Sequence, residues 1–186
     1  MRKEQAIRIA LVVLLTFVII SLSYHVLAFR PGIYPLEDQR NVRNFLIGFE
    51  ELTTEMTPAE VSHLHDVKSV MLGVAISSIL ALLITAGLTY TLKKKEVLHI
   101  YKKAGYATII TVIALVITGL GSFGFLFSVF HGIFFPQGNY IFSSSSTLIT
   151  LFPQSFFVAR FAEVLVLSVV LASIFIGVIV YLEKKK

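Results

Sequence analysis

Residues 104–130 read AGYATIITVIALVITGLGSFGFLFSVF and contain no charged side chain. A helix needs about 20 consecutive apolar residues to cross the roughly 30 Å of hydrocarbon in a bilayer, and this stretch is long enough. On either side of it, three more stretches are similarly apolar. The sequence therefore predicts an all-α integral membrane protein, with a single domain over residues 1–186 and four transmembrane helices at 9–29, 69–92, 104–130 and 161–182.

Composition supports a membrane protein and excludes several chemistries. Apolar residues make up 56% of the chain and charged residues 15%, whereas soluble domains carry roughly 25% charged residues. The chain has no Cys, so disulfides, thiolate metal sites and a cysteine nucleophile are excluded.

The charged residues predict the orientation in the membrane. The chain carries 16 basic and 11 acidic side chains, and most of the basic ones flank the same ends of the four spans. Because cytoplasmic loops are enriched in Lys and Arg, we expect both termini to be cytoplasmic. The basic excess then belongs to a lipid surface, and we expect no nucleic-acid partner. Two partly helical segments are expected outside the cell membrane, at 30–68 and 131–160.

The first outer segment shows two helical patterns. In residues 39–52, four apolar side chains share one stripe and predict an amphipathic helix, namely Val42, Phe45, Leu46 and Phe49. Further on, Thr57 suits a helix cap, Pro58 the first helical position and Glu60 the third. A second helix is therefore expected to start near Thr57 and to continue into the span at 69–92.

The second outer segment is rich in Phe and has no charge before Arg160. Such a loop would be poor in water, so it is expected to serve either as lipid anchorage or as a surface for acyl chains. The run Ser143–Ser146 fits a polar loop and helix cap better than a nucleophile, because no nucleophile motif surrounds it. Upstream, Gly119, Gly121 and Gly124 predict close helix packing or a bend.

Two histidines are expected to meet at the outer side. His63 lies 30 residues before Lys93, and His131 lies 28 residues after Lys103. On antiparallel neighbouring helices rising about 1.5 Å per residue, these positions reach the same height within roughly one turn. His65 lies close to His63 but points to another side of the helix.

The motifs around these histidines resemble a known family. HLHDVK at 63–68 is followed by FHGIFF at 130–135, then by Asn139 and by LFPQSFF at 151–157. This order is similar to Lit, the bacterial lipoprotein intramolecular transacylase. The chain departs from the family pattern after Phe142, where Ser143 stands in place of an Asp.

The resemblance implies a function and a set of site residues. The sn-2 acyl chain of a diacylglyceryl-Cys lipoprotein would move to that residue's own N-terminal amine, giving a lyso-form lipoprotein at the extracytoplasmic face of the cell membrane. His131 and His63 would be the catalytic pair, with Asp66 orienting His63. Two imidazoles are a sufficient acid–base set, so neither a cofactor nor a metal is expected. Contacts to the lipoprotein substrate are expected from Arg160, Asn139, Tyr140 and Lys68.

Two other functions stay open at this stage. Imidazoles from His25, from His63 or His65, and from His131 could instead hold a metal or a haem. A structural membrane subunit would need none of these histidines. The oligomeric state cannot be read from the sequence, and His65 remains an alternative to His63.

Overall fold

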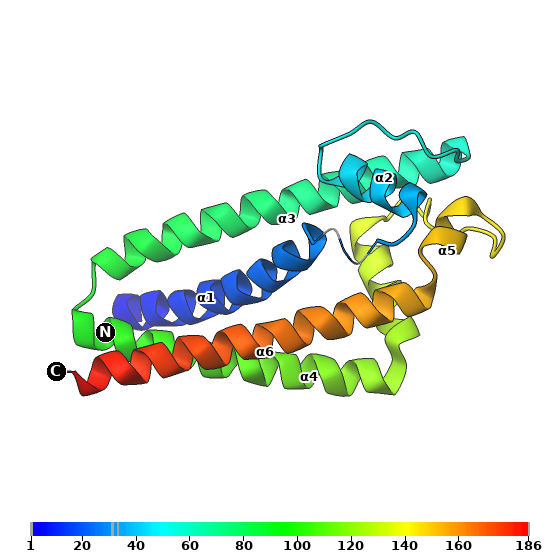
Figure 1. Ribbon diagram of the computed structural model, residues 1–186. Helices are drawn as coiled ribbons and strands as arrows, with labels where there is room; N and C mark the ends of the chain where they lie inside the picture. Colours follow the sequence, from blue (N-terminus) through cyan, green and yellow to red (C-terminus); the bar gives the residue numbers. More distant parts are fainter. Residues whose placement is uncertain (1, 31, 33, 186) are drawn as a thin grey trace. The chain divides into compact units, whose positions relative to one another are not determined.

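The computed structural model describes residues 2–30, 32 and 34–185, and it is helical (Figure 1). Four helices are long and apolar enough to cross a membrane, as the sequence predicts. Two short helices lie within the predicted outer segments. In chain order the helices are α1 (Arg2–Ala28), α2 (Glu37–Leu46), α3 (Pro58–Tyr90), α4 (Lys94–Phe134), α5 (Thr147–Leu151) and α6 (Gln154–Lys184).

The chain forms two compact units, each built from segments distant in the sequence. Unit 1 comprises Met1–His25, Ala75–Ile117 and Glu163–Lys186, and unit 2 comprises Val26–Val74 and Thr118–Ala162. The long helices contribute to both units. The single domain expected from the sequence therefore stays a prediction.

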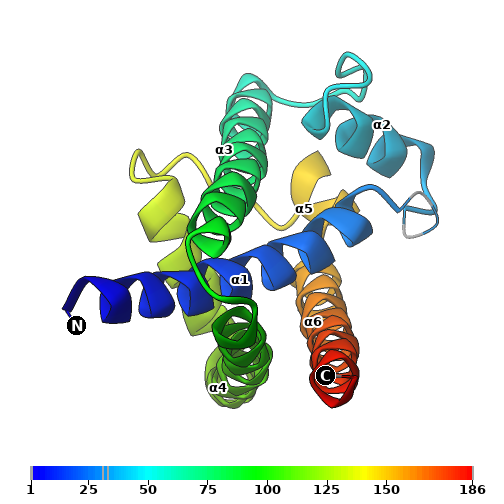
Figure 2. The same cartoon turned by 90° about the vertical axis from the view of Figure 1, so that its left-hand side faces the viewer.

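Unit 1 is held by contacts between helical segments. Lys102 Nζ lies 2.6 Å from Glu183 Oε2, which joins α4 to α6, and Arg8 pairs with Glu96 at 3.4 Å, which joins α1 to α4. These parts of α4 and α6 are seen nearly end-on in Figure 2. Gly105 on α4 allows close approach, since a Cβ there would lie 2.5 Å from Ile176 Cγ1. The sequence reading did not identify this glycine as a packing position.

Unit 2 has a buried apolar core. Helix α2 contributes Val42 and Phe45, α3 contributes Leu64, and the α5 region contributes Leu148, Leu151 and Phe152. The predicted amphipathic helix is thus present, and its apolar face packs against other parts of unit 2. It is also shorter than expected, because it ends at Leu46 and Gly48 turns the chain with φ +81°. Phe49 lies beyond the helix with an exposed side chain, so its predicted place on the buried stripe was wrong.

Helix α4 breaks where glycines are dense. Ser122 has extended backbone angles, φ −169° and ψ 97°, and its Oγ accepts a hydrogen bond from Phe125 N at 3.2 Å, as an N-cap residue does. Since Gly121 and Gly124 flank this residue, the bend expected there is confirmed. The helix then resumes and carries His131.

Candidate active site

Helix α3 places His63 in unit 2, six residues after the helix cap at Thr57. Glu60 Oε2 accepts from Thr57 N at 2.8 Å, and Thr57 Oγ1 accepts from Glu60 N at 3.3 Å, so the predicted capping box is present. The same face that buries Leu64 and Glu60 also buries His63, which is 6% exposed. Within the described residues, His63 Nδ1 is buried without a hydrogen-bond partner.

His131 lies in the last turn of α4, and a hydrogen bond selects its tautomer. Its Nδ1 is 2.8 Å from the carbonyl oxygen of Phe127. A carbonyl oxygen can only accept, so Nδ1 must carry the proton. In the neutral ring, the lone pair then lies on Nε2, which is the nitrogen available as a base. The ring itself is 9% exposed.

The two imidazoles lie against each other. Their ring centroids are 6.1 Å apart and their planes differ by 25°. Phe135, 1% exposed, packs against both rings, with centroid distances of 4.8 Å to His63 and 5.4 Å to His131. The heights of the two histidines along their helices, counted from the sequence, therefore correctly predicted that the rings lie side by side.

Asp66 anchors the loop that follows α4. Its Oδ2 accepts from Gln137 Nε2 at 2.9 Å and from Asn139 Nδ2 at 2.6 Å. Gly138 between them takes a positive φ of 77°, which lets both amides turn toward one carboxylate. Both of these hydrogen bonds go to the loop, so Asp66 would act on His63 through its charge and through Asn139. Gln137 was not identified from the sequence, because an isolated Gln in a loop carries no signal.

The other candidate residues differ in how close they come to the pair. Tyr140 packs on His131 with ring centroids 4.8 Å apart. Lys68 Nζ lies 4.2 Å from the Phe45 ring centroid, and Arg160 lies over the Phe156 ring at 5.5 Å. The structure thus places Asn139 and Tyr140 beside the histidine pair, whereas the cationic groups of Lys68 and Arg160 lie over phenylalanine rings.

His65 faces a different neighbour. Its ring meets the edge of Phe45 at a centroid distance of 5.1 Å. His63 is therefore the histidine of this motif that stacks on His131. Among the described residues, no group of three His, Cys, Asp or Glu side chains is arranged to hold a metal ion. His25 belongs to unit 1, where its Nε2 lies 3.4 Å from Ser78 Oγ.

An apolar surface adjoins the pair. Large side chains of the last turns of α4 remain exposed, namely Phe130, Ile133 and Phe134. Phe130 also contacts the His131 ring edge-on at 5.4 Å. Such a surface suits acyl chains or the lipid of the bilayer.

The fold and these residues define a class: an integral membrane protein with two adjacent histidines. The sequence model of the Lit family, the lipoprotein intramolecular transacylases, matches residues 41–157. The chain therefore belongs to this family. The match includes both histidines, Asp66, and the loop after α4 that Asp66 holds.

Solved structures agree on the fold. The in meso structure of the membrane integral lipoprotein intramolecular transacylase Lit from Bacillus cereus matches with a TM-score of 0.85 and 19% identity, covering 99% of this chain and 97% of that one. Two variants of that protein, with a histidine replaced by Arg or by Ala, each match with a TM-score of 0.79 and 19% identity. They cover 99% of this chain and 93% and 95% of theirs. A comparison with curated protein sequences gave no match.

Proposed function

We propose that this enzyme moves the sn-2 acyl chain of a diacylglyceryl-modified N-terminal Cys to the α-amino group of that same Cys. The amine nitrogen attacks the ester carbonyl, a C–N bond forms, and the bond to the sn-2 oxygen breaks. From ammonium to amide the nitrogen gives up two protons, of which one reaches the departing alkoxide and the other is released to solvent. Nucleophile and ester belong to one molecule, so holding them together supplies much of the rate, about 7–11 kcal/mol in favourable cases.

His131 is proposed as the general base and His63 as its partner. The observation that carries this assignment is the hydrogen bond from His131 Nδ1 to Phe127 O, which leaves the Nε2 lone pair for the ammonium proton. His63, stacked 6.1 Å away, would donate to the alkoxide or to the tetrahedral oxyanion. Its buried Nδ1 has no hydrogen bond of normal length and angle among the described residues, where the Asn139 side chain is the polar group that approaches the ring, and a substrate oxygen would give it an acceptor.

The neighbouring polar groups are proposed as substrate contacts and positioning residues. Asp66 would hold Asn139 in place beside the pair, because its Oδ2 accepts from that amide at 2.6 Å. Tyr140, packed on His131, would contact the ester or the glyceryl group. Lys68 and Arg160 are kept as weaker candidates for the lipoprotein backbone, since their cationic groups already lie over aromatic rings.

The site is proposed to face the extracytoplasmic side, where the acyl chains of a membrane-anchored lipoprotein lie. Residues 30–68 and 131–160 carry few of the basic side chains, which supports this orientation. The exposed Phe130 and Phe134 would let the acyl chains of the substrate arrive from the bilayer. No nucleic-acid partner is proposed.

The test locates the acyl chain on the product. Because the reaction is an isomerisation, the intact mass does not change, and tandem mass spectrometry must show the acyl group on the Cys nitrogen. A purified diacylglyceryl lipopeptide is incubated with the enzyme in detergent. We expect His131→Ala and His63→Ala to lower the rate at least about 100-fold, as for loss of acid–base catalysis.

His65→Ala is the matched control, since it removes an exposed imidazole two residues from His63. It should retain a rate close to that of the unchanged enzyme. If the unchanged enzyme leaves the N-terminal Cys amine of the lipopeptide unacylated, the proposed reaction is wrong. If His63→Ala behaves like His65→Ala while His131→Ala is inactive, the proposed pairing is wrong.

A further inference from the structure

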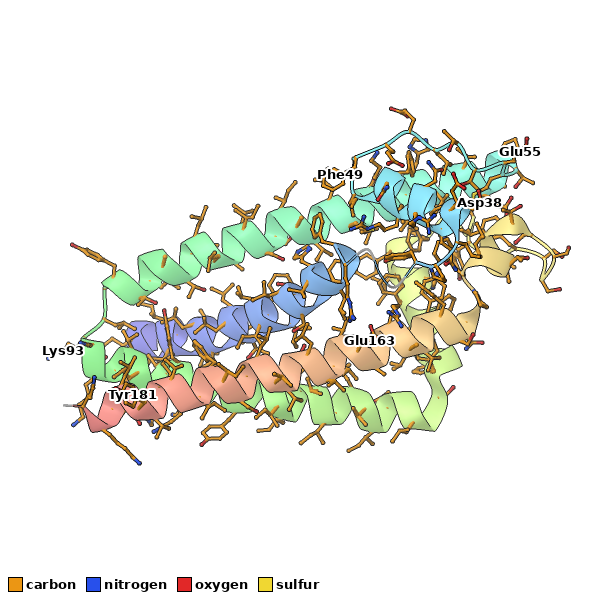
Figure 3. The ribbon with its side chains drawn as sticks, in the orientation of Figure 1. Asp38, Phe49, Glu55, Lys93, Glu163 and Tyr181 are labelled. Carbon is orange, nitrogen blue, oxygen red and sulfur yellow. The ribbon has the colours of Figure 1, made fainter. Side chains whose placement is uncertain are left out.

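A cavity in unit 1 has no part in the proposed acyl transfer. It measures about 910 Å³ and lies between α1 and the beginning of α4, with Lys93 at the turn before α4 (Figure 3). All of its lining residues belong to unit 1. The question is which ligand such a cavity would accept.

The polar part of the cavity carries uncompensated positive charge. Lys93, Lys95 and Lys103 line it, together with the ion pair of Arg8 and Glu96. In the described part of the chain these three lysines have no carboxylate within salt-bridge distance, whereas nearby Lys102 is paired with Glu183. Glu4 is the one remaining carboxylate in the lining. The lysines therefore favour an anionic ligand.

The rest of the lining is apolar and continues along the helix axis. On α1, Ile9, Val12 and Val13 follow Arg8 with helical spacing, so they share its face. Ile9 and Val13 are 58% and 60% exposed and lie inside a predicted transmembrane span. Across the cavity, Ile100 of α4 adds a buried apolar wall. A small water-soluble anion would bind the lysines without contacting these apolar side chains.

Contacts between α1 and α4 give the order of the two parts along the helices. Arg8 pairs with Glu96, and eight residues further on Thr16 Oγ1 donates to Ala104 O at 3.4 Å. The two helices thus run side by side in the same direction here. Arg8, Lys93 and Lys95 lie at the beginnings of the two helices, and the apolar residues of α1 follow toward the hydrocarbon, as headgroup and chain do in a lipid. Lys103 lies about two turns further along α4, beside the apolar part, and its long stem allows the ammonium group to reach back toward the headgroup.

We propose that this cavity binds an anionic phospholipid, with the phosphate headgroup among Lys93, Lys95 and Lys103 and an acyl chain along Ile9, Val12 and Val13. Basic pockets between transmembrane helices are suited to such headgroups. The long lysine stems can cover apolar surface while the ammonium groups reach the phosphate. The site is separate from the histidine pair, and it does not depend on the proposed transfer reaction.

The test measures lipid binding by the full-length protein in a neutral detergent. Native mass spectrometry follows titration with phosphatidylglycerol, with phosphatidylcholine of the same chains, and with glycerol 3-phosphate. We expect tight binding of phosphatidylglycerol alone. Removing two charges with K95Q/K103Q should weaken it about 20-fold or more, at about fivefold for each lysine.

The matched control is K94Q/K184Q, which removes the same charge from exposed lysines outside the cavity lining. This variant should bind phosphatidylglycerol like the unchanged protein. Equal binding of the two lipids, equal loss in both double variants, or equal binding of glycerol 3-phosphate would each overturn the proposal. The single variants K95Q and K103Q repeat the measurement if the double variant does not stay monodisperse.

Discussion

Glu60 joins two segments of unit 2 that are far apart in the sequence. Its side chain is 1% exposed, and its two carboxylate oxygens have separate tasks. Oε2 accepts from Thr57 N and Oγ1 at the start of α3, while Oε1 accepts from Leu148 N at 2.8 Å in the first turn of α5. The carboxylate thus satisfies helix-end donors on both elements, and the N–H of Leu148 would otherwise be buried without a partner.

Glu60→Ala should lower the free energy of unfolding by about 3 kcal/mol, because the buried Leu148 N–H loses its acceptor and a charged hydrogen bond is lost at Thr57. Glu60→Gln should cost less, since its single amide oxygen can replace only one of the two acceptors. Unfolding in detergent followed by circular dichroism measures both. The control is Glu55→Ala, an exposed carboxylate of the preceding loop labelled in Figure 3. If Glu55→Ala costs as much as Glu60→Ala, the helix-end role is wrong.

Asp66 should act through the loop that it holds. In Asp66→Ala both amides lose their acceptor, so the turnover of the lipopeptide should fall at least about tenfold while the protein stays folded, given hydrogen bonds to a charged group of about 1.5–3 kcal/mol each. Asp66→Asn keeps an acceptor oxygen and should recover part of the rate. Gln137→Ala removes one of the two bonds, from an exposed side chain, and should fall between them. A rate unaffected by Asp66→Ala would show that Asp66 has no positioning role.

Among the helices, features set by neighbouring residues or by the regular helical rise were predicted correctly. Hydrogen bonds between distant segments were not predicted. The capping pattern at Thr57 and Glu60 gave the start of α3, and the helical rise gave the meeting of His63 with His131. Ser146 caps α5 by accepting from Ile149 N, as the serine run suggested. These features depend on neighbours within a few residues, or on a constant rise per residue, which the sequence contains.

The missed features depend on partners far along the chain. Glu60 reaches Leu148 across 88 residues, and the bonds of Gln137 to Asp66 span 71. The exact break at Ser122 could not be chosen among several small residues, and the end of α2 at Leu46 required the turn at Gly48 to be recognised. In each case the deciding contact belongs to the folded unit.

The packing of α4 on α6 gives a prediction for a single methyl group. Gly105→Ala would place Cβ 2.5 Å from Ile176 Cγ1, a branch atom near the backbone that cannot move aside freely. We expect a loss of about 1–3 kcal/mol, as for overpacking in a close-packed interior. Gly177→Ala on α6 is the control, because a Cβ there meets no atom within 4 Å, and its thermal midpoint in detergent should not fall. Equal midpoints for the two variants would show that the close approach is not limiting.

For the whole molecule, the distribution of charge predicts an orientation that the absence of Cys makes easy to measure. A single introduced Cys would be the only thiol in the chain. Ser144→Cys lies on the exposed loop before α5, and Lys94→Cys lies at the exposed start of α4. With both termini cytoplasmic, a membrane-impermeant maleimide should label Ser144→Cys in intact cells, and Lys94→Cys only after permeabilisation. The reverse pattern would put the histidine pair on the side away from the lipid-modified end of the lipoprotein substrate, and the proposed extracytoplasmic acyl transfer could not stand.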